Sequence, residues 1–188
     1  MPRELAWLQW ITVVWMLVEC GVALTAAARA QSVALLAFGA DSLVELLSAT
    51  VVLLAFAPRF RLNKERAERA AAMLLFALAA VVTGMAAFDF ERPMKTSWMG
   101  IAITALALVA MPVLAGLKRR QARKLNNRTV AADAAQSATC AYLAAVTLAG
   151  LGAFAVWHVA WVDSVAALAA VPVLVVEGRR AWRGEGCC

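Results

Sequence analysis

The sequence predicts an all-α, polytopic membrane protein, built as one bundle of six transmembrane helices. Of its 188 residues, 64% are hydrophobic and 16% are charged, and the mean hydropathy is +0.77. Ordinary soluble domains carry about 45–50% apolar and about 25% charged residues. The apolar residues form six runs of about 20 residues, the length that a helix needs to cross the hydrocarbon core of a bilayer. Short basic segments separate several of these runs, which is typical of a multi-pass protein.

The six runs follow one another along the whole chain. They cover residues 5–27, 32–57, 67–88, 97–117, 130–156 and 159–177. The polar segments between them are RAQ, PRFRLNKERAE, DFERPMKT, KRRQARKLNNR and WHVAW. Little sequence remains outside the runs, so residues 1–188 are expected to form a single transmembrane domain with no soluble domain. Pro112 and Pro172 predict kinks in the fourth and sixth helices.

The first run has to be distinguished from a cleavable signal peptide, because AAARAQ at residues 26–31 has the small-residue pattern of a cleavage site. An apolar stretch of about 22 residues is longer than the core of a signal peptide, which has about 7–15 residues. Glu19 also interrupts it. A retained helix is therefore expected.

Lys and Arg predict the orientation, since these residues stay on the cytoplasmic side when loops are short. With both termini inside, the inner segments hold 15 of the 18 basic residues and the outer loops hold three. This predicts an N-in, C-in protein of the plasma membrane, of bacterial inner-membrane type. The net charge of +6 is then explained by basic loops facing anionic lipid headgroups, and no nucleic-acid partner is expected.

Two carboxylates lie inside the second apolar run, in ADSLVELL at residues 40–47. Asp41 and Glu45 are four residues apart, so they share one helix face, and Glu45 falls close to the bilayer midplane. Glu19 lies at a similar depth in the first helix. A charge at mid-bilayer costs about 2.5–3.5 kcal/mol on insertion scales, and such residues usually face a cavity, a partner or an ion path.

Two explanations fit these acids: protonated side chains that hydrogen-bond Ser, Thr or Gln, or a cation site. The assignment places every Lys and Arg in a loop or at a helix end, with Lys118 in the loop after the fourth helix. No basic group is then expected inside the membrane to neutralise the acids. The pairing of Asp41 with Glu45, and the third acid near them, favour the cation site.

The fifth run indicates which cation such a site would prefer. In ADAAQSATCAYL, Asp133, Gln136 and Cys140 are spaced to share one helix face. A thiolate, carboxylates and an amide oxygen suit a borderline transition metal, whereas Mg²⁺ and Ca²⁺ prefer oxygen ligands alone. The alternative for Cys140 is an inert small hydrophobic residue.

The predicted metal site has four main candidate ligands and four further ones. The main candidate ligands are Asp41, Glu45, Gln136 and Cys140, and the further candidates are Glu19, Asp133, Cys187 and Cys188. The terminal pair Cys187 and Cys188 could collect soft ions at the inner mouth, carry lipid, or have no function. Asp133 could be a helix cap, an entry ligand or a gate.

Two further residues are given structural roles. Asp163 precedes an apolar run and is predicted to be the N-cap of the sixth helix. His158, the single histidine, lies in WHVAW and is predicted to belong to an aromatic belt at the membrane interface.

The stretch QSVALLAFGADSLVELLSATVVLL, followed by ERAERAA, resembles the second helix of the cation diffusion facilitator superfamily. ADAAQSATCAYLAAVTLAGLGAFAVWHVAWVDSVAALAAVPVLVVEG is similar to its fifth and sixth helices. The resemblance implies a six-helix exporter of Zn²⁺ or similar ions, commonly by proton antiport. It places the ligands of helix two on Asp41 and Glu45. The His and Asp ligands of helix five fall on Gln136 and Cys140, which implies a softer ion, and a small branch without the family's cytoplasmic C-terminal domain is expected.

The expected function is therefore transport of a divalent transition-metal cation, Zn-like or softer. Export by proton antiport is expected, through a midplane site on the second and fifth helices. No permanently bound cofactor is expected, and the expected partners are the bilayer, the metal ion, protons and a second copy in a homodimer. The alternatives are a non-transporting membrane partner or metal sensor, and a transporter of small organic cations. An enzyme is not expected, because the sequence has no phosphate-binding glycine loop, no G-x-S-x-G and no H-E-x-x-H.

Overall fold

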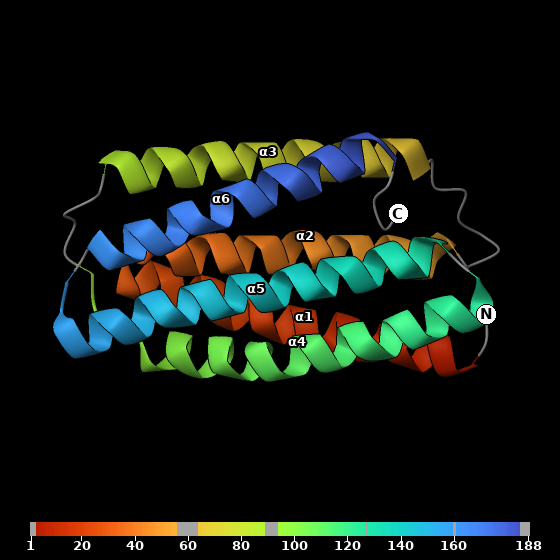
Figure 1. Ribbon diagram of the computed structural model, residues 1–188, viewed down its shortest axis with the longest axis horizontal. Coiled ribbons are helices and arrows are strands. Elements are labelled where there is room, and N and C mark those ends of the chain that lie inside the picture. Colours follow the sequence, from red (N-terminus) through yellow and green to blue (C-terminus); the bar gives the residue numbers. More distant parts are fainter. Residues whose placement is uncertain (1–2, 56–63, 89–93, 127, 160, 185–188) are drawn as a thin grey trace.

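The computed structural model describes residues 3–55, 64–88, 94–126, 128–159 and 161–184. Within these residues the chain forms six α-helices (Figure 1). They are α1 (Arg3–Ala30), α2 (Val33–Ala55), α3 (Lys64–Phe88), α4 (Trp98–Leu125), α5 (Arg128–Trp157) and α6 (Trp161–Trp182). The prediction of an all-α chain is confirmed.

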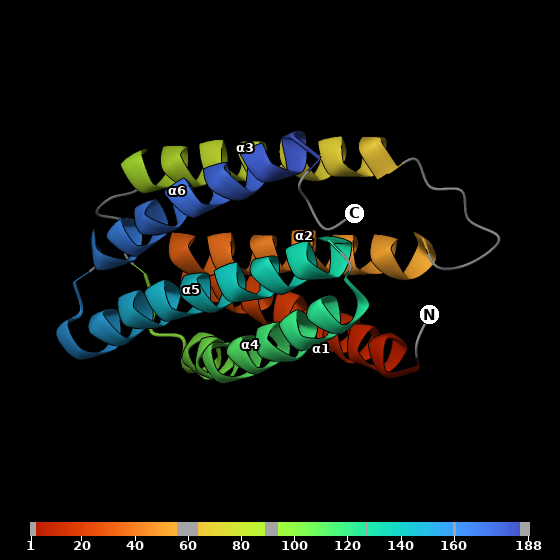
Figure 2. The ribbon, with the colours of Figure 1, turned by 45° about the vertical axis from the view of Figure 1, so that its right-hand side comes forward.

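The helices lie side by side along the long axis of the molecule (Figures 1 and 2). α4 packs along α5, α1 along α2, and α3 along α6. α1, α2, α4 and α5 form one group, and the α3–α6 pair lies along one side of it. α2 contacts α1, α3, α5 and α6, so a polar side chain on α2 has neighbours on several helices.

Buried charged side chains and exposed large apolar ones distinguish the bundle from a typical soluble protein. The buried residues include Gln9, Glu19, Asp41, Glu45, Lys118 and Asp133. The exposed surface carries large apolar side chains on every helix, such as Leu17, Leu47, Val81, Val109 and Val165. Extended apolar surface of this kind is rare on soluble monomers, and it indicates a lipid environment.

Five helices of the described chain, α1, α3, α4, α5 and α6, are long and apolar enough to cross a membrane. α2 has 23 residues, which is also sufficient in length. The bundle is therefore that of a multi-pass helical membrane protein.

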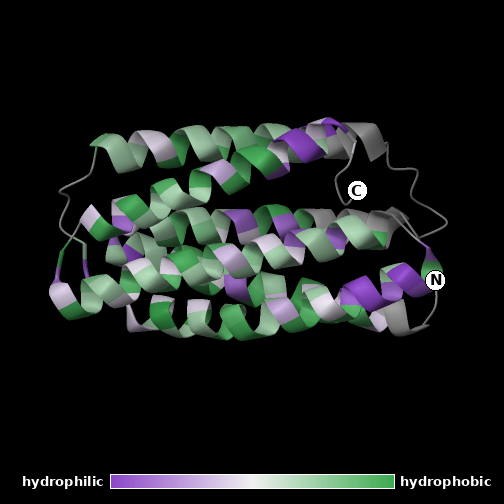
Figure 3. Ribbon diagram, in the orientation of Figure 1, coloured by the Kyte–Doolittle hydropathy of each residue, from purple (hydrophilic) through white to green (hydrophobic). Residues whose placement is uncertain are grey.

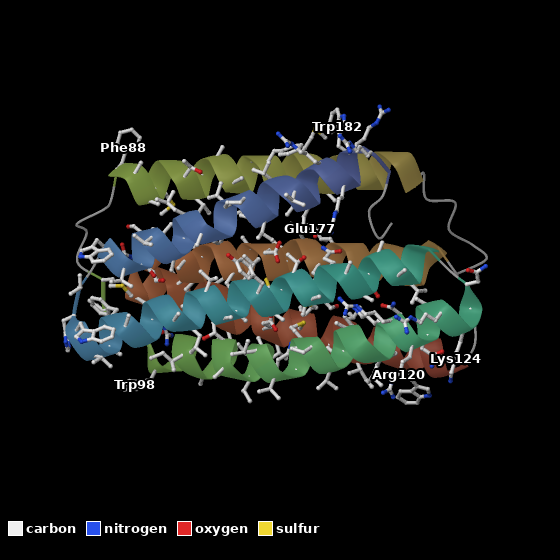
Figure 4. The ribbon with its side chains drawn as sticks, in the orientation of Figure 1. Phe88, Trp98, Arg120, Lys124, Glu177 and Trp182 are labelled. Carbon is white, nitrogen blue, oxygen red and sulfur yellow. The ribbon has the colours of Figure 1, made fainter. Side chains whose placement is uncertain are left out.

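In the described chain, basic side chains are concentrated at one end of the bundle, whereas Arg29 lies in the last turn of α1 at the opposite end. The last turns of α4 and α6 contribute Arg123, Lys124, Arg179 and Arg180, and hydrophilic residues are visible at these helix ends in Figure 3. Figure 4 shows Arg120, Lys124 and Trp182 at this end, with Phe88 and Trp98 at the other. α1 begins and α6 ends at the basic end.

The predicted helix boundaries need one substantial correction, in the fourth helix. The predicted run ends at residue 117, but α4 continues to Leu125 and is capped by Asn126, whose φ of 46° is left-handed. Lys118 is therefore inside a helix, and its side chain is 0% exposed. The prediction that every Lys and Arg occupies a loop or a helix end is wrong for this residue. α4 and α6 remain helical through Pro112 and Pro172.

The prediction that Asp163 caps the sixth helix is also wrong. α6 begins at Trp161, and the Asp163 carboxylate accepts hydrogen bonds from the first turn of α2 instead. The donors are the backbone N–H of Val33 at 2.7 Å, that of Ala34 at 3.3 Å, and the hydroxyl of Ser32 at 2.6 Å. These N–H groups have no partner within their own helix, so α6 supplies the cap of α2.

Candidate functional site

The interior of the bundle contains a network built around the ammonium group of Lys118. Its Nζ lies 2.9 Å from Oδ1 of Asp133 and 2.8 Å from Oγ of Ser137 on α5. It lies 3.9 Å from Oε1 of Glu45 on α2. The hydroxyl of Ser137 reaches the same Glu45 oxygen at 2.8 Å. The network therefore joins α2, α4 and α5 by charge and hydrogen bonds.

Asp133 is held from a second side by α1. The amide Nε2 of Gln9 donates to Oδ2 of Asp133 at 2.8 Å, so both carboxylate oxygens of Asp133 accept hydrogen bonds. Of the three roles left open by the sequence, a helix cap does not describe this arrangement, because Gln9 on α1 and Lys118 on α4 donate to the carboxylate. Asp133 is instead the direct ion-pair partner of Lys118.

The sequence contains a signal for the position of Lys118 that is missed when helix ends are set by the length of each apolar run. The buried residues of α4 recur every three or four positions, and they include Met111, Leu114, Ala115, Lys118 and Ala122. This is the period of one helix face. Lys118 therefore continues the inward-facing stripe of α4 beyond the apolar run.

Glu19 on α1 connects a second set of buried groups. Its Oε1 accepts hydrogen bonds from the hydroxyl of Ser42 on α2 at 2.7 Å and from the thiol of Cys140 on α5 at 3.4 Å. Its Oε2 accepts from the indole N–H of Trp15. Cys140 is fully buried, and its direct polar contact in the described chain is to Glu19.

Asp41 lies one turn before Glu45 on α2, with an exposed fraction of 2%. Its electrostatic neighbours are Glu45, Glu177 and Glu19. Oδ2 of Asp41 and Oε2 of Glu45 are buried, and neither has a hydrogen-bond partner among the described residues. Buried polar atoms of this kind are uncommon and call for an explanation such as a bound ion, a proton or water.

Glu177 was not identified as a candidate from the sequence. It ends the sixth apolar run, where it reads as the start of the polar tail. In the structure it lies on α6 facing the centre of the bundle (Figure 4), with 14% of its side chain exposed. It accepts a hydrogen bond from Thr139 on α5 at 2.9 Å and pairs with Arg180 at 3.3 Å.

The structure describes only some of the remaining predicted ligands. Gln136 is 8% exposed and lies one turn before Cys140 on α5. Cys187 and Cys188 lie outside the described residues. Within the described part of the chain, no three His, Cys, Asp or Glu side chains are arranged as a metal-binding group.

His158 is exposed and lies at the end of α5, with its ring 5.9 Å from that of Phe154.

Among the described residues, the site offers several carboxyl groups and one ammonium group in a water-poor interior. Glu19, Asp41, Glu45 and Asp133 are each at most 2% exposed, as is Lys118. Buried charges are strongly destabilising unless they are paired. One lysine cannot compensate four ionised carboxylates, so such a cluster has to take up protons or further cations.

Comparison of the chain with protein-family models finds no match, and comparison with curated proteins finds none at a significant level.

Proposed function

We propose that this protein transports a divalent transition-metal cation across a membrane in exchange for protons. The observation that carries the proposal is the pair of buried oxygens on Asp41 and Glu45 that have no hydrogen-bond partner among the described residues. Acidic groups inside a membrane usually mark an ion path or proton relay. The resemblance of the second, fifth and sixth helices to cation diffusion facilitators supports the same function.

The proposed cargo site comprises the carboxylates of Asp41 and Glu45 with Gln136 and Cys140 of α5, and Glu19 beside them. A thiol and carboxylates together favour a borderline or soft ion such as Zn²⁺. Metal ligands must be deprotonated, so binding of the ion releases protons. Loss of the ion to the opposite side allows the carboxylates to be protonated again, which couples the two fluxes.

In this proposal all six helices, α2 included, span the membrane, and the basic end faces the cytoplasm. Access would alternate by movement of the group α1, α2, α4 and α5 against the α3–α6 pair. Export is the proposed direction, and a homodimer in the plasma membrane is the proposed assembly.

The test is metal flux into vesicles that contain the purified protein and an internal proton-sensitive dye. Wild-type vesicles are expected to take up Zn²⁺ with an opposite movement of protons. The double variant Glu45→Gln/Cys140→Ala is expected to lose both signals. Cys20→Ala is the matched control, because Cys20 is a second buried free thiol outside the proposed ligand set, and it should retain transport. Unchanged flux in the double variant would refute the assignment, and metal binding without flux would instead identify a sensor.

One observation favours a second candidate, transport of small organic cations. The site already accommodates an ammonium group, since Lys118 lies within hydrogen-bond distance of Asp133 and Ser137. Alkylation of Cys140 distinguishes the two cargoes. Protection by Zn²⁺ but not by lipophilic amines supports a metal, and the opposite result supports an organic cation.

A further inference from the structure

We infer that Lys118 is a tethered cation that competes with the cargo for Glu45. When no cargo is bound, its ammonium group compensates both Asp133 and Glu45; a cargo cation at Glu45 displaces it toward Asp133. The inference rests on the proposed function for the identity of the cargo. It adds a residue that tunes the affinity for the cargo, which the resemblance does not supply.

The two carboxylates bind the ammonium group unequally, and this asymmetry is the basis of the inference. Nζ of Lys118 contacts Asp133 directly at 2.9 Å, but it is 3.9 Å from Glu45. Between Lys118 and Glu45 stands the hydroxyl of Ser137, which contacts Nζ at 2.8 Å and Oε1 of Glu45 at 2.8 Å. Lys118 can therefore lose its interaction with Glu45 and keep Asp133, the closer of its two carboxylate partners.

Asp133 is suited to hold the lysine after displacement. Its second oxygen, Oδ2, accepts a hydrogen bond from Gln9 on α1 at 2.8 Å. This contact fixes the carboxylate while Oδ1 remains paired with Nζ. Gln9 and Asp133 thus act as positioning residues, and Glu45 is the carboxylate that both cations can use.

Snorkelling offers a different explanation for a lysine in a membrane helix, since long basic side chains near helix ends extend toward the headgroups. Lys118 is about 10 Å from the end of α4, at about 1.5 Å per residue, which is within reach of such an arrangement. Its side chain is instead 0% exposed and turned onto α5 and α2. The ammonium group therefore interacts with Asp133 and Glu45 inside the bundle and not with lipid headgroups.

Competition follows from electrostatics. Two cations about 4 Å apart repel strongly wherever water does not screen them, and Glu45 is itself fully buried. A cargo ion at Glu45 therefore binds more weakly than it would beside an uncharged residue at position 118. The same repulsion favours release of the ion, so Lys118 sets the balance between affinity and turnover.

The test is titration of the purified, detergent-solubilised full chain with Zn²⁺. Lys118→Gln is expected to bind Zn²⁺ at least about tenfold more tightly than wild type, a change of about 1.4 kcal/mol. Lys124→Gln removes the same charge from an exposed position on the same helix and should bind as wild type does. Equal affinity of Lys118→Gln and Lys124→Gln would overturn the inference.

A second variant keeps the test decisive if Lys118→Gln fails to fold because Asp133 loses its partner. Lys118→Gln/Asp133→Asn removes the ion pair as a neutral unit and leaves Glu45 without its cation. It should also bind Zn²⁺ more tightly than wild type, and wild-type affinity here would again refute competition.

Measurements of both flux and binding distinguish a failure of this inference from a failure of the proposed function. Tighter binding by Lys118→Gln in a protein without vesicle flux supports the lysine's role and refutes transport. Wild-type flux with unchanged affinity in both Lys118 variants supports transport and refutes the lysine's role. Absence of Zn²⁺ binding in wild type and in every variant refutes both.

Discussion

At the scale of single residues, Asp163 shows how one carboxylate can join two distant segments. It sits in the first turn of α6, yet its oxygens accept from Ser32, Val33 and Ala34 at the start of α2. Ser32 in turn accepts from the N–H of Leu35 at 3.1 Å. A negative charge at a helix N-terminus is also favoured by the helix dipole. Asp163 therefore fixes the helix that carries Asp41 and Glu45.

We expect Asp163→Ala to lower the free energy of unfolding by about 2 kcal/mol, the upper range for loss of a helix cap. Asp163→Asn keeps one oxygen acceptor and should cost less. The measurement is equilibrium unfolding in mixed detergent micelles. A fully stable Asp163→Ala variant would contradict the capping role.

At the scale of helices, the close approach of α5 and α6 depends on a glycine. A Cβ added at Gly150 would lie 2.7 Å from Cβ of Ala166 on α6, which is too short for two carbons. Gly152, two residues further along α5, would place a Cβ with no atom within 4 Å. The same helix thus contains a glycine required by packing and one that is not.

Gly150→Ala is expected to destabilise the protein by about 1–3 kcal/mol, because the added methyl group overpacks the α5–α6 contact. Gly152→Ala is the matched control, and it should be neutral or stabilising by up to about 1 kcal/mol, since alanine is the better helix former. Thermal unfolding of the two variants in the same detergent compares them. Equal melting temperatures would show that the helices are not in close contact at Gly150.

At the scale of the whole molecule, exposed tryptophans mark both ends of an apolar belt. Trp98, Trp157 and Trp161 lie at one end, and Trp7 and Trp182 lie at the other. α6 has 22 residues from Trp161 to Trp182, which spans about 33 Å at about 1.5 Å per residue. This length matches a hydrocarbon core of about 30 Å, and tryptophan is enriched at the two membrane interfaces.

The proposed orientation predicts opposite labelling of the two ends in intact cells. His158→Cys, at the end with few basic residues, is expected to react with a membrane-impermeant maleimide added outside. Lys124→Cys, at the basic end, should react only after the membrane is opened. The parent chain, labelled in parallel, measures the background from its own cysteines. The reverse pattern would invert the proposed topology.

The site was partly predictable from the sequence. Burial of Asp41 and Glu45 follows from their place within an apolar run, and their shared face follows from a spacing of four residues. Both features are local, and the structure confirms the burial. Glu177 and the pairing of Cys140 with Glu19 could not be predicted, because each depends on a neighbour from another helix.

The sequence by itself determined the helical class, the apolar length of the helices and the concentration of basic residues between particular runs. These properties depend on composition within about 20 consecutive residues. Only the tertiary structure decided that Lys118 pairs with Asp133 and Glu45, and that Asp163 caps α2. Each residue turns a helix by about 100°, so partners across helices depend on how each helix is rotated. A helix that is apolar on all sides contains little information about that rotation, and packing against its neighbours fixes it.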